Sequence, residues 1–393
     1  MAAVSATLSV ANLSLAAAIW MTFVGGLFAL RIVVPGRVHI GQKLKDGSRR
    51  EYKLNGLRLM LVLAAAIASA HALHLFSLGT VNRLFWPLFV VANVFVVLHT
   101  GYLYVTGAPK RSAKRSATHL STPDSDSGAA ASSDTIAVAA PSLDFFALVK
   151  DLWMGVELNP ELWGVDLKMF AYLPSLLGLW VLNLSFGVAQ WEMLGHLTTR
   201  MWLYQAFFTA YIINYFEFEY GMLHTWDVIA EDFGYMLVWG DYVLVPFFYS
   251  ICGWYLIGYT EALPFGQLVA LPILFAVGFV VFRGTNQQKH DYKEHPEKKI
   301  WGKTPEAIGG RLLVSGFWGI GRKLNYTGEL MVYFAWTLTA GFQSVVPYLL
   351  PLWLVCLFSH RAWRDDQKCR AKYGPLWSEY CARARFRMIP FLY

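Results

Sequence analysis

The side chains best suited to chemistry lie in two polar, arginine-rich blocks, residues 311–330 and 359–393. Between them runs an apolar pair of segments interrupted at Pro347 and Pro351. Such a pair predicts a hairpin across a membrane, which returns the second block to the side of the first. Arginine is well suited to phosphate because its planar fork matches phosphate oxygens in pairs. We therefore interpret the two blocks as a site for a phosphorylated cofactor.

A third polar segment, residues 283–303, adds cations to this site. Lys289 and Lys293 are four residues apart, so a helix presents both on one face. Alone, such a run is usually a solvated face. Further cations come from separate loops on the same predicted side: Arg322, Lys323, Arg361 and Arg364. Their convergence suits a diphosphate and a 2′-phosphate. The sequence has neither GxGxxG after a strand nor GxxxxGK[ST], so helices and loops must hold any nucleotide.

Carboxylates in or beside apolar segments form the second candidate group, because acids are costly in lipid and usually mark function. The four are Glu219, Asp227, Glu231 and Asp241. A spacing of four puts Asp227 and Glu231 on one helix face. Each acid alone could cap a helix or hydrogen-bond a Tyr or Trp across the bundle. For the cluster, we favour a role in donating a proton or polarising a substrate.

The cysteines and histidines do not form the patterns of a disulfide framework or a metal site. The four cysteines show no CxxC pairing, and the histidines show no HExxH or other metal spacing. We therefore expect no bound metal and interpret the histidines as structural.

The composition predicts an all-α, polytopic membrane protein. Of its residues 56% are hydrophobic and 15% charged, whereas a soluble domain has about 25% charged residues. Several apolar stretches reach the length of about 20 residues that crosses a bilayer, and only helices satisfy their backbone groups there. We expect a bundle of about nine to ten transmembrane helices. The expected spans are residues 13–34, 57–78, 84–105, 171–189, 203–220, one ending near 259, 268–282, 330–346 and 348–358, with a short or re-entrant tenth at 312–320.

The basic residues fall in a few loops between these spans. The positive-inside rule makes those loops cytosolic and the N-terminus lumenal. The net charge of +7 is therefore interpreted as the signal of cytosolic loops of a protein in the lipid bilayer, and we expect no contact with nucleic acid. The first apolar run has no basic segment before it, which favours a retained span over a cleaved signal.

A compositional break divides the chain. Residues 108–141 are rich in Ser, Ala, Thr and Asp, and such a segment cannot bury enough apolar surface to offset its ordering entropy. We predict a disordered linker there. It would separate a three-span unit, residues 1–107, from a catalytic membrane domain, residues 142–393.

Over about residues 152–393, the chain resembles the sterol reductase family. The strongest matches are GFWGIGRKLNYTGEL, GFQSVVPY and HRAWRDDQKCRAKYGPLWSEYC, with TWDVIAEDFGYMLVWGD and NQQK in the right order. The resemblance implies a ten-span bundle in the endoplasmic reticulum membrane, a sterol substrate and NADPH in a cytosol-facing pocket. It makes other sterol-pathway enzymes the natural protein partners. Carried over residue by residue, the cofactor contacts would be Lys289, Lys293, Leu313, Trp318, Asn325, Tyr326, Asp365, Cys369, Tyr373 and Tyr380, with Arg361 beside them.

The branch of the family is read from smaller differences. TWD, VDLKMF, GRK, GFQSVVP and HRAWRD resemble the fungal-type C-24(28) reductases, which implies the last step of ergosterol-type synthesis. By contrast, WGD and NYTGEL resemble the C-14 and C-7 reductases. We take C-24(28) as the first hypothesis and the C-14 or C-7 bond as the alternative.

Two other classes share parts of the pattern. A membrane methyltransferase of the isoprenylcysteine type has a similar C-terminal block but would bind S-adenosylmethionine and is usually much shorter. A lamin-receptor-like tether shares the bundle but carries a long basic N-terminal region.

An isolated sterol alkene is not an electrophile, so a reductase must protonate it before hydride arrives from NADPH. We expect one of the four acids to supply or relay that proton.

Overall fold

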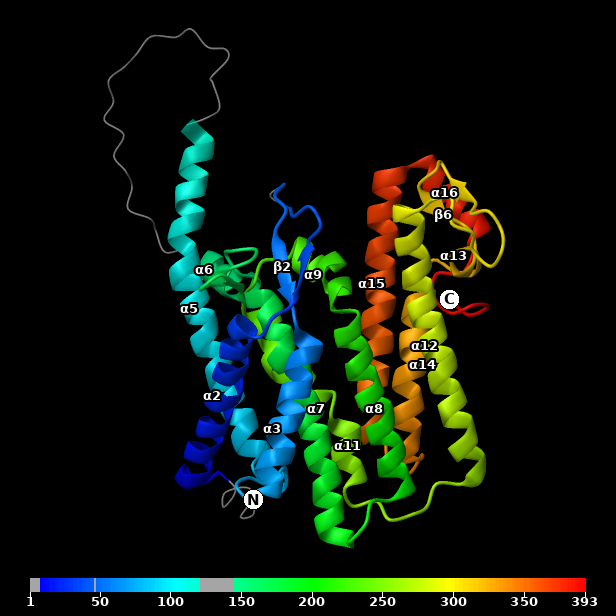
Figure 1. The fold of residues 1–393 in the computed structure, drawn as a ribbon. Coiled ribbons are helices and arrows are strands. Elements are labelled where there is room, and N and C mark those ends of the chain that lie inside the picture. Colours follow the sequence, from blue (N-terminus) through cyan, green and yellow to red (C-terminus); the bar gives the residue numbers. More distant parts are fainter. Residues whose placement is uncertain (1–7, 46, 121–144) are drawn as a thin grey trace, which may run out of the picture. The chain divides into compact units, whose positions relative to one another are not determined.

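The computed structural model describes residues 8–45, 47–120 and 145–393. Helices dominate the described chain, and its strands form three short, two-stranded antiparallel sheets (Figure 1). The chain divides into two compact units. The first comprises Met1–Val188 and Ala210–Ser250, and the second comprises Ala189–Thr209 and Ile251–Tyr393.

The first unit contains most of the N-terminal helices. Its elements are α2 (Val10–Val33), β1 (Arg37–Ile40), β2 (Glu51–Leu54), α3 (Gly56–Ala72), α4 (Gly79–Arg83), α5 (Phe85–Leu120), α6 (Phe145–Met154), β3 (Glu161–Leu162), β4 (Val165–Asp166), most of α7 (Leu167–Leu194), the end of α8 (Thr199–Glu217), the 3₁₀ turn η1 (Glu219–His224), α9 (Trp226–Ile229), α10 (Tyr235–Trp239) and the π-helix η2 (Gly240–Phe248). Strands β1 and β2 pair from Arg37 opposite Leu54 to Ile40 opposite Glu51.

The second unit carries the polar blocks. Its elements are α11 (Ile251–Leu256), α12 (Phe265–Glu294), β5 (Ala307–Ile308), β6 (Leu312–Leu313), α13 (Phe317–Ile320), α14 (Leu324–Thr337), the 3₁₀ turns η3 (Leu338–Ala340) and η4 (Val346–Tyr348), α15 (Leu349–Tyr373) and α16 (Pro375–Arg383). The expected hairpin is present as α14 and α15.

The prediction of an all-α, polytopic membrane protein is confirmed. In the described part of the chain, five helical segments are long and apolar enough to cross a membrane: Val10–Val33, Phe85–Lys110, Leu167–Leu194, Tyr235–Leu256 and Phe265–Glu294. The other expected spans coincide with helices that are shorter or more polar: α3, α8, α14 and α15. The tenth, at 312–320, is instead a two-residue strand and a four-residue helix, because Gly316 at φ 61° breaks the segment.

The division at residues 107 and 141 stays a prediction. Helix α5 continues to Leu120, beyond the expected start of the linker at residue 108. Residues 121–141 of that linker lie outside the described residues.

A close contact between α12 and α14 fixes the framework of the second unit, where the two helices lie side by side (Figure 1). Glycines make the approach possible. A Cβ on Gly278 would lie 2.9 Å from the carbonyl oxygen of Gly328, and one on Gly328 would lie 2.4 Å from the backbone nitrogen of Phe282. Small residues at helix crossings are the usual means of close packing in membranes. The contact sets the distance between the polar ends of both helices.

We expect Gly278→Val to push α12 away from α14 and lower the midpoint of thermal unfolding of the purified protein. Overfilling a packed contact typically costs about 1–3 kcal/mol. Gly266→Val on the same helix is the matched control, because a Cβ on Gly266 meets nothing within 4 Å. Equal midpoints for the two variants would contradict the contact.

Candidate active site

All the residues predicted to contact a cofactor lie in the second unit, on six segments. Lys289 and Lys293 lie near the end of α12, Leu313 on β6, Trp318 on α13, Asn325 and Tyr326 in the first turn of α14, Arg361, Asp365, Cys369 and Tyr373 on α15, and Tyr380 on α16. The expectation that Lys289 and Lys293 share a helix is confirmed, since α12 runs to Glu294.

Lys289 and Trp318 join α12 to α13. The Nζ atom of Lys289 lies 4.7 Å from the centroid of the Trp318 ring, a cation–π distance. The indole Nε1–H donates to the carbonyl oxygen of Thr285 at 2.8 Å, which fixes the ring. Trp318 also packs in a buried cluster with Leu313 and Ile300. The Lys289 side chain is exposed. Desolvation of its ammonium, together with the cations Lys323 and Lys293, lowers the pKa of Lys289 to about 8, so its charge is still present at neutral pH.

Lys323 and Asp365 join the start of α14 to α15. Their Nζ and Oδ2 atoms are 2.7 Å apart, and Lys323 Nζ lies 5.9 Å from the centroid of the Tyr326 ring. Tyr326 in turn stacks on Phe358 at 4.9 Å. Burial alone would lower the pKa of Lys323, but Tyr326 and Asp365 outweigh it and raise that pKa above its ordinary value. Lys323 is therefore a fixed cation beside these residues. The convergence of cations in the sequence included it, whereas the cofactor contacts implied by the family resemblance did not.

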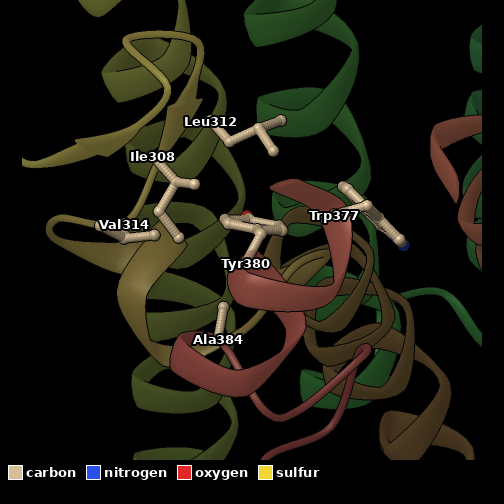
Figure 2. Close-up of a cluster of buried hydrophobic side chains, with 6 residues drawn as sticks. All are labelled: Ile308, Leu312, Val314, Trp377, Tyr380 and Ala384. Atoms are coloured by element: carbon tan, nitrogen blue, oxygen red, sulfur yellow. The ribbon is translucent and has the colours of Figure 1, made fainter. Parts of the chain in front are cut away.

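The β5–β6 hairpin packs on α16 and forms an apolar wall. Figure 2 shows Ile308, Leu312 and Val314 of the hairpin segment facing Tyr380 and its neighbours on α16. The local sequence explains how the chain reaches this position: α15 ends at Tyr373, Gly374 follows it with a φ of 56° that suits glycine, and Pro375 begins α16.

Two of the predicted residues on this wall are uncharged at neutral pH. Cys369 packs against the cluster, whereas Tyr380 is a buried member of it. Burial raises the pKa of both the Cys369 thiol and the Tyr380 phenol. They therefore bring no negative charge near the cations, and the thiol is a poor nucleophile.

Asn325 holds an unused acceptor. Its Oδ1 atom is buried and has no hydrogen-bond partner among the described residues. Buried polar atoms normally have partners, and an exception calls for an explanation such as an absent ligand. An amide donor of a ligand fits this position.

Arg322 has a structural role that sequence reasoning missed. Its buried Nη1 donates to the carbonyl oxygen of Ala384 at 2.7 Å, and its Nε lies 3.6 Å from Oδ1 of the buried Asp366. Thr327 Oγ1 donates to the carbonyl oxygen of Met388 at 2.6 Å. These bonds fasten the last residues against α14, so the guanidinium of Arg322 is committed to the fold. Only long-range contacts reveal this, because nothing local in the sequence marks it.

The four predicted acids lie in the first unit, and Glu219 is part of a buried network. Its Oε1 lies 3.3 Å from Arg31 Nη1, and its Oε2 accepts the backbone N–H of Gly56 at 2.9 Å. Arg31 also donates to Asn55 Oδ1 at 2.7 Å. Burial raises the pKa of the Glu219 carboxyl, and the Arg31 guanidinium opposes that shift. The geometry gives Glu219 a role in joining α2, the start of α3 and η1.

Asp227 and Glu231 do not share a helix face. That prediction is wrong because α9 ends at Ile229, before Glu231 is reached. The buried Lys168 holds the segment instead: its Nζ donates to the backbone carbonyls of Asp227 at 2.8 Å and Glu231 at 2.7 Å. The Glu231 carboxylate accepts the Trp226 indole N–H at 2.6 Å.

Asp241 has the most enclosed position of the remaining acids. It is 9% exposed and lies in the first turn of the π-helix η2. Its carboxylate forms no ion pair with any described residue. Short π-helical segments occur frequently at functional sites.

The fold and site define a helical membrane enzyme, and comparison with known proteins gives its family. The family model "Ergosterol biosynthesis ERG4/ERG24 family" matches residues 9–393. The chain therefore belongs to this sterol reductase family, which confirms the resemblance and the assignment as an oxidoreductase. Similar proteins include the Delta(14)-sterol reductase of Arabidopsis thaliana, 38% identical over 92% of this chain and 91% of that protein. Others are the Delta(14)-sterol reductases of Methylotuvimicrobium alcaliphilum (34%, over 96% and 83%) and Dictyostelium discoideum (35%, over 96% and 78%).

These relatives bear on the choice of branch. All three are named for the C-14 bond, so they favour the alternative over the first hypothesis of a C-24(28) reductase.

We expect Arg31→Met to destabilise the protein, because it leaves the Glu219 carboxyl buried without its cation. Removing one partner of a buried pair costs about 3–5 kcal/mol, which a fall in the thermal unfolding midpoint would show. The double variant Arg31→Met with Glu219→Gln should recover part of the loss, since no unpaired charge remains. The exposed Arg37 provides the control, as Arg37→Met. An unchanged midpoint in Arg31→Met would contradict the structural role of the pair.

Proposed function

We propose that this protein is an NADPH-dependent Δ14-sterol reductase of the endoplasmic reticulum membrane. The choice of the C-14 bond rests on one observation: three relatives that align with nearly the whole chain are all named Delta(14)-sterol reductase. The family match supports a sterol as substrate. The multi-pass helical structure supports a membrane enzyme.

The chemistry of the second unit fits a phosphorylated dinucleotide. Lys289, Lys293, Lys323 and Arg361 supply cations from three helical segments, and Asp365 orients one of them. The residues of the apolar wall are neutral and do not repel phosphate. The unpartnered Oδ1 of Asn325 suits an amide N–H, such as that of a nicotinamide carboxamide. We propose that these residues hold NADPH.

The reaction needs a proton before a hydride, because an unactivated alkene does not accept hydride. A proton added at C15 of a 14,15-double bond leaves a tertiary cation at C14. NADPH, when bound, supplies the hydride that quenches this cation. The protein must hold the sterol, exclude water from the cation and deliver the proton at C15.

Asp241 is our proposed source or relay of the proton. Among the four acids, Glu219 is engaged by Arg31 and Glu231 by Trp226, whereas Asp241 is buried without an ion pair in the described part of the chain. A carboxyl in apolar surroundings tends to retain its proton, which is the form that a general acid requires.

We expect the purified protein with NADPH to saturate the C14–C15 bond of a 14,15-unsaturated sterol and to leave a 24(28)-methylene sterol unchanged. Gas chromatography with mass spectrometry of each reaction measures the products. Reduction of the 24(28) bond alone would contradict the Δ14 assignment and support the hypothesis of a C-24(28) reductase. Methylation by S-adenosylmethionine with no reduction would overturn the proposed class.

We expect Lys289→Gln or Lys293→Gln to raise the KM for NADPH by about tenfold, since a lost charge-assisted hydrogen bond costs about that much in binding. If one of these lysines contacts the 2′-phosphate, its substitution should raise the KM for NADH less than the KM for NADPH, because NADH lacks that phosphate. Steady-state kinetics with both nucleotides measure this. Lys299 is exposed in the following loop and provides the control, as Lys299→Gln. A KM for NADPH that is unchanged from the unsubstituted protein in all three variants would exclude the lysine contacts.

We expect Asp241→Asn to reduce kcat by about 100-fold or more, the usual contribution of a positioned acid, while NADPH binding by fluorescence stays unchanged. Glu231→Gln should retain most activity. Full turnover by a folded Asp241→Asn protein would rule out this acid.

A further inference from the structure

An apolar cavity of about 480 Å³ lies within the first unit, far along the chain from every residue assigned to NADPH. Its walls come from α2, α3, α4, α5, α7 and the end of η2, and include Phe23, Leu27, Leu63, Ile67 and Phe247. The lining side chains are almost all aliphatic or aromatic. Pockets for small molecules typically have volumes of about 300–1,000 Å³.

A second cavity of about 410 Å³ adjoins the first and shares Ile19 and Phe76 with it. Its lining is different in kind. It includes the hydrogen-bonding side chains of His71, His74, Ser77 and Thr80, which lie at the end of α3 and in the turn before α4. His74 has a left-handed φ of 56°, which turns the chain sharply at this point. Together the two adjoining cavities form an apolar chamber with a polar end.

This chemistry matches an apolar molecule with one hydrogen-bonding group at its end, as a sterol has. A phospholipid fits less well, because tight phosphate sites usually gather several cations. The described lining of both cavities contains no Lys or Arg, and one cation lies beside it: Arg83 Nη2 donates to Thr80 Oγ1 at 3.1 Å. The positive-inside rule puts residues 71–80 at the lumenal face. A sterol hydroxyl at the polar end would then lie at the water interface, with its rings in the hydrocarbon layer.

We propose that this chamber binds a sterol, with the hydroxyl among the His71–Thr80 side chains and the rings against α2, α3 and α7. The inference rests on the proposed function only in taking a sterol as a molecule that this enzyme meets. It adds a sterol-binding site in the first unit, formed by residues different from those that hold the cofactor.

Two adjacent glycines on α2 give a matched pair for testing the chamber. A Cβ on Gly25 or Gly26 would meet nothing within 4 Å, but only Gly26 lines the cavity. Gly26→Leu therefore fills the chamber, whereas Gly25→Leu makes the same change of sequence outside it. Leu63→Trp fills the chamber from α3 and serves as a second variant if Gly26→Leu does not fold.

The experiment uses the purified full chain in lipid nanodiscs and a photoreactive sterol with a diazirine in ring B. Mass spectrometry of peptides after irradiation should place adducts on the lining of α2 and α3. An excess of unlabelled sterol should compete, and an equal excess of phosphatidylcholine should not. Gly26→Leu or Leu63→Trp should reduce these adducts about tenfold, and Gly25→Leu should leave them unchanged.

Adducts confined to other segments, equal competition by phosphatidylcholine, or full labelling of both filled variants would overturn the proposal. The reductase assay on the same preparation separates this inference from the proposed function. Labelling of the chamber by a protein that reduces no 14,15-unsaturated sterol would refute the function alone. Reduction without chamber labelling would refute the inference alone.

Discussion

The ion pair between Lys323 and Asp365 is the contact on which the candidate cofactor site depends. It joins the first polar block to the second across the hairpin of α14 and α15, with 2.7 Å between Nζ and Oδ2. Partly exposed pairs contribute only about 0–1 kcal/mol to stability, so packing must already hold the blocks together. The buried Arg322, through Ala384 and Asp366, supplies that contact between the blocks, and the glycine contact holds α12 beside α14. The ion pair then determines how the charges are oriented, and Lys289 on the neighbouring helix extends the positive region.

The proposed reaction draws on both units in different ways. The second unit provides cations and neutral walls, which suit an anionic cofactor. The first unit provides buried carboxyls, which could donate a proton, and an apolar chamber, which suits an apolar ligand. In the first unit, two buried cations serve the fold: Arg31 pairs with Glu219, and Lys168 binds backbone carbonyls. Of these acids, Asp241 is the one whose buried carboxylate forms no ion pair with any described residue.

Much of this could be predicted from the sequence, and the failures have physical causes. The hairpin and the lysine pair follow from hydropathy and helical spacing, which are local properties, and the structure has both. The shared helix face of Asp227 and Glu231 failed because Lys168, distant in sequence, stabilises a non-helical turn through their carbonyls. Arg322 was grouped with phosphate-binding cations because its type and loop are right, but its partners lie about sixty residues away in the chain. The relatives favour the C-14 alternative over the first hypothesis of a C-24(28) reductase. The sequence motifs could not decide between these branches, because some of them resembled each branch.

We expect one dinucleotide to contact α12, α14 and α15 together, and a structure of the full chain determined with NADPH tests this most directly. We expect density for the phosphates beside Lys289 and Lys293 and density for the nicotinamide amide within hydrogen-bond distance of Asn325. Density for NADPH that contacts none of Lys289, Asn325 and Asp365 would contradict this expectation.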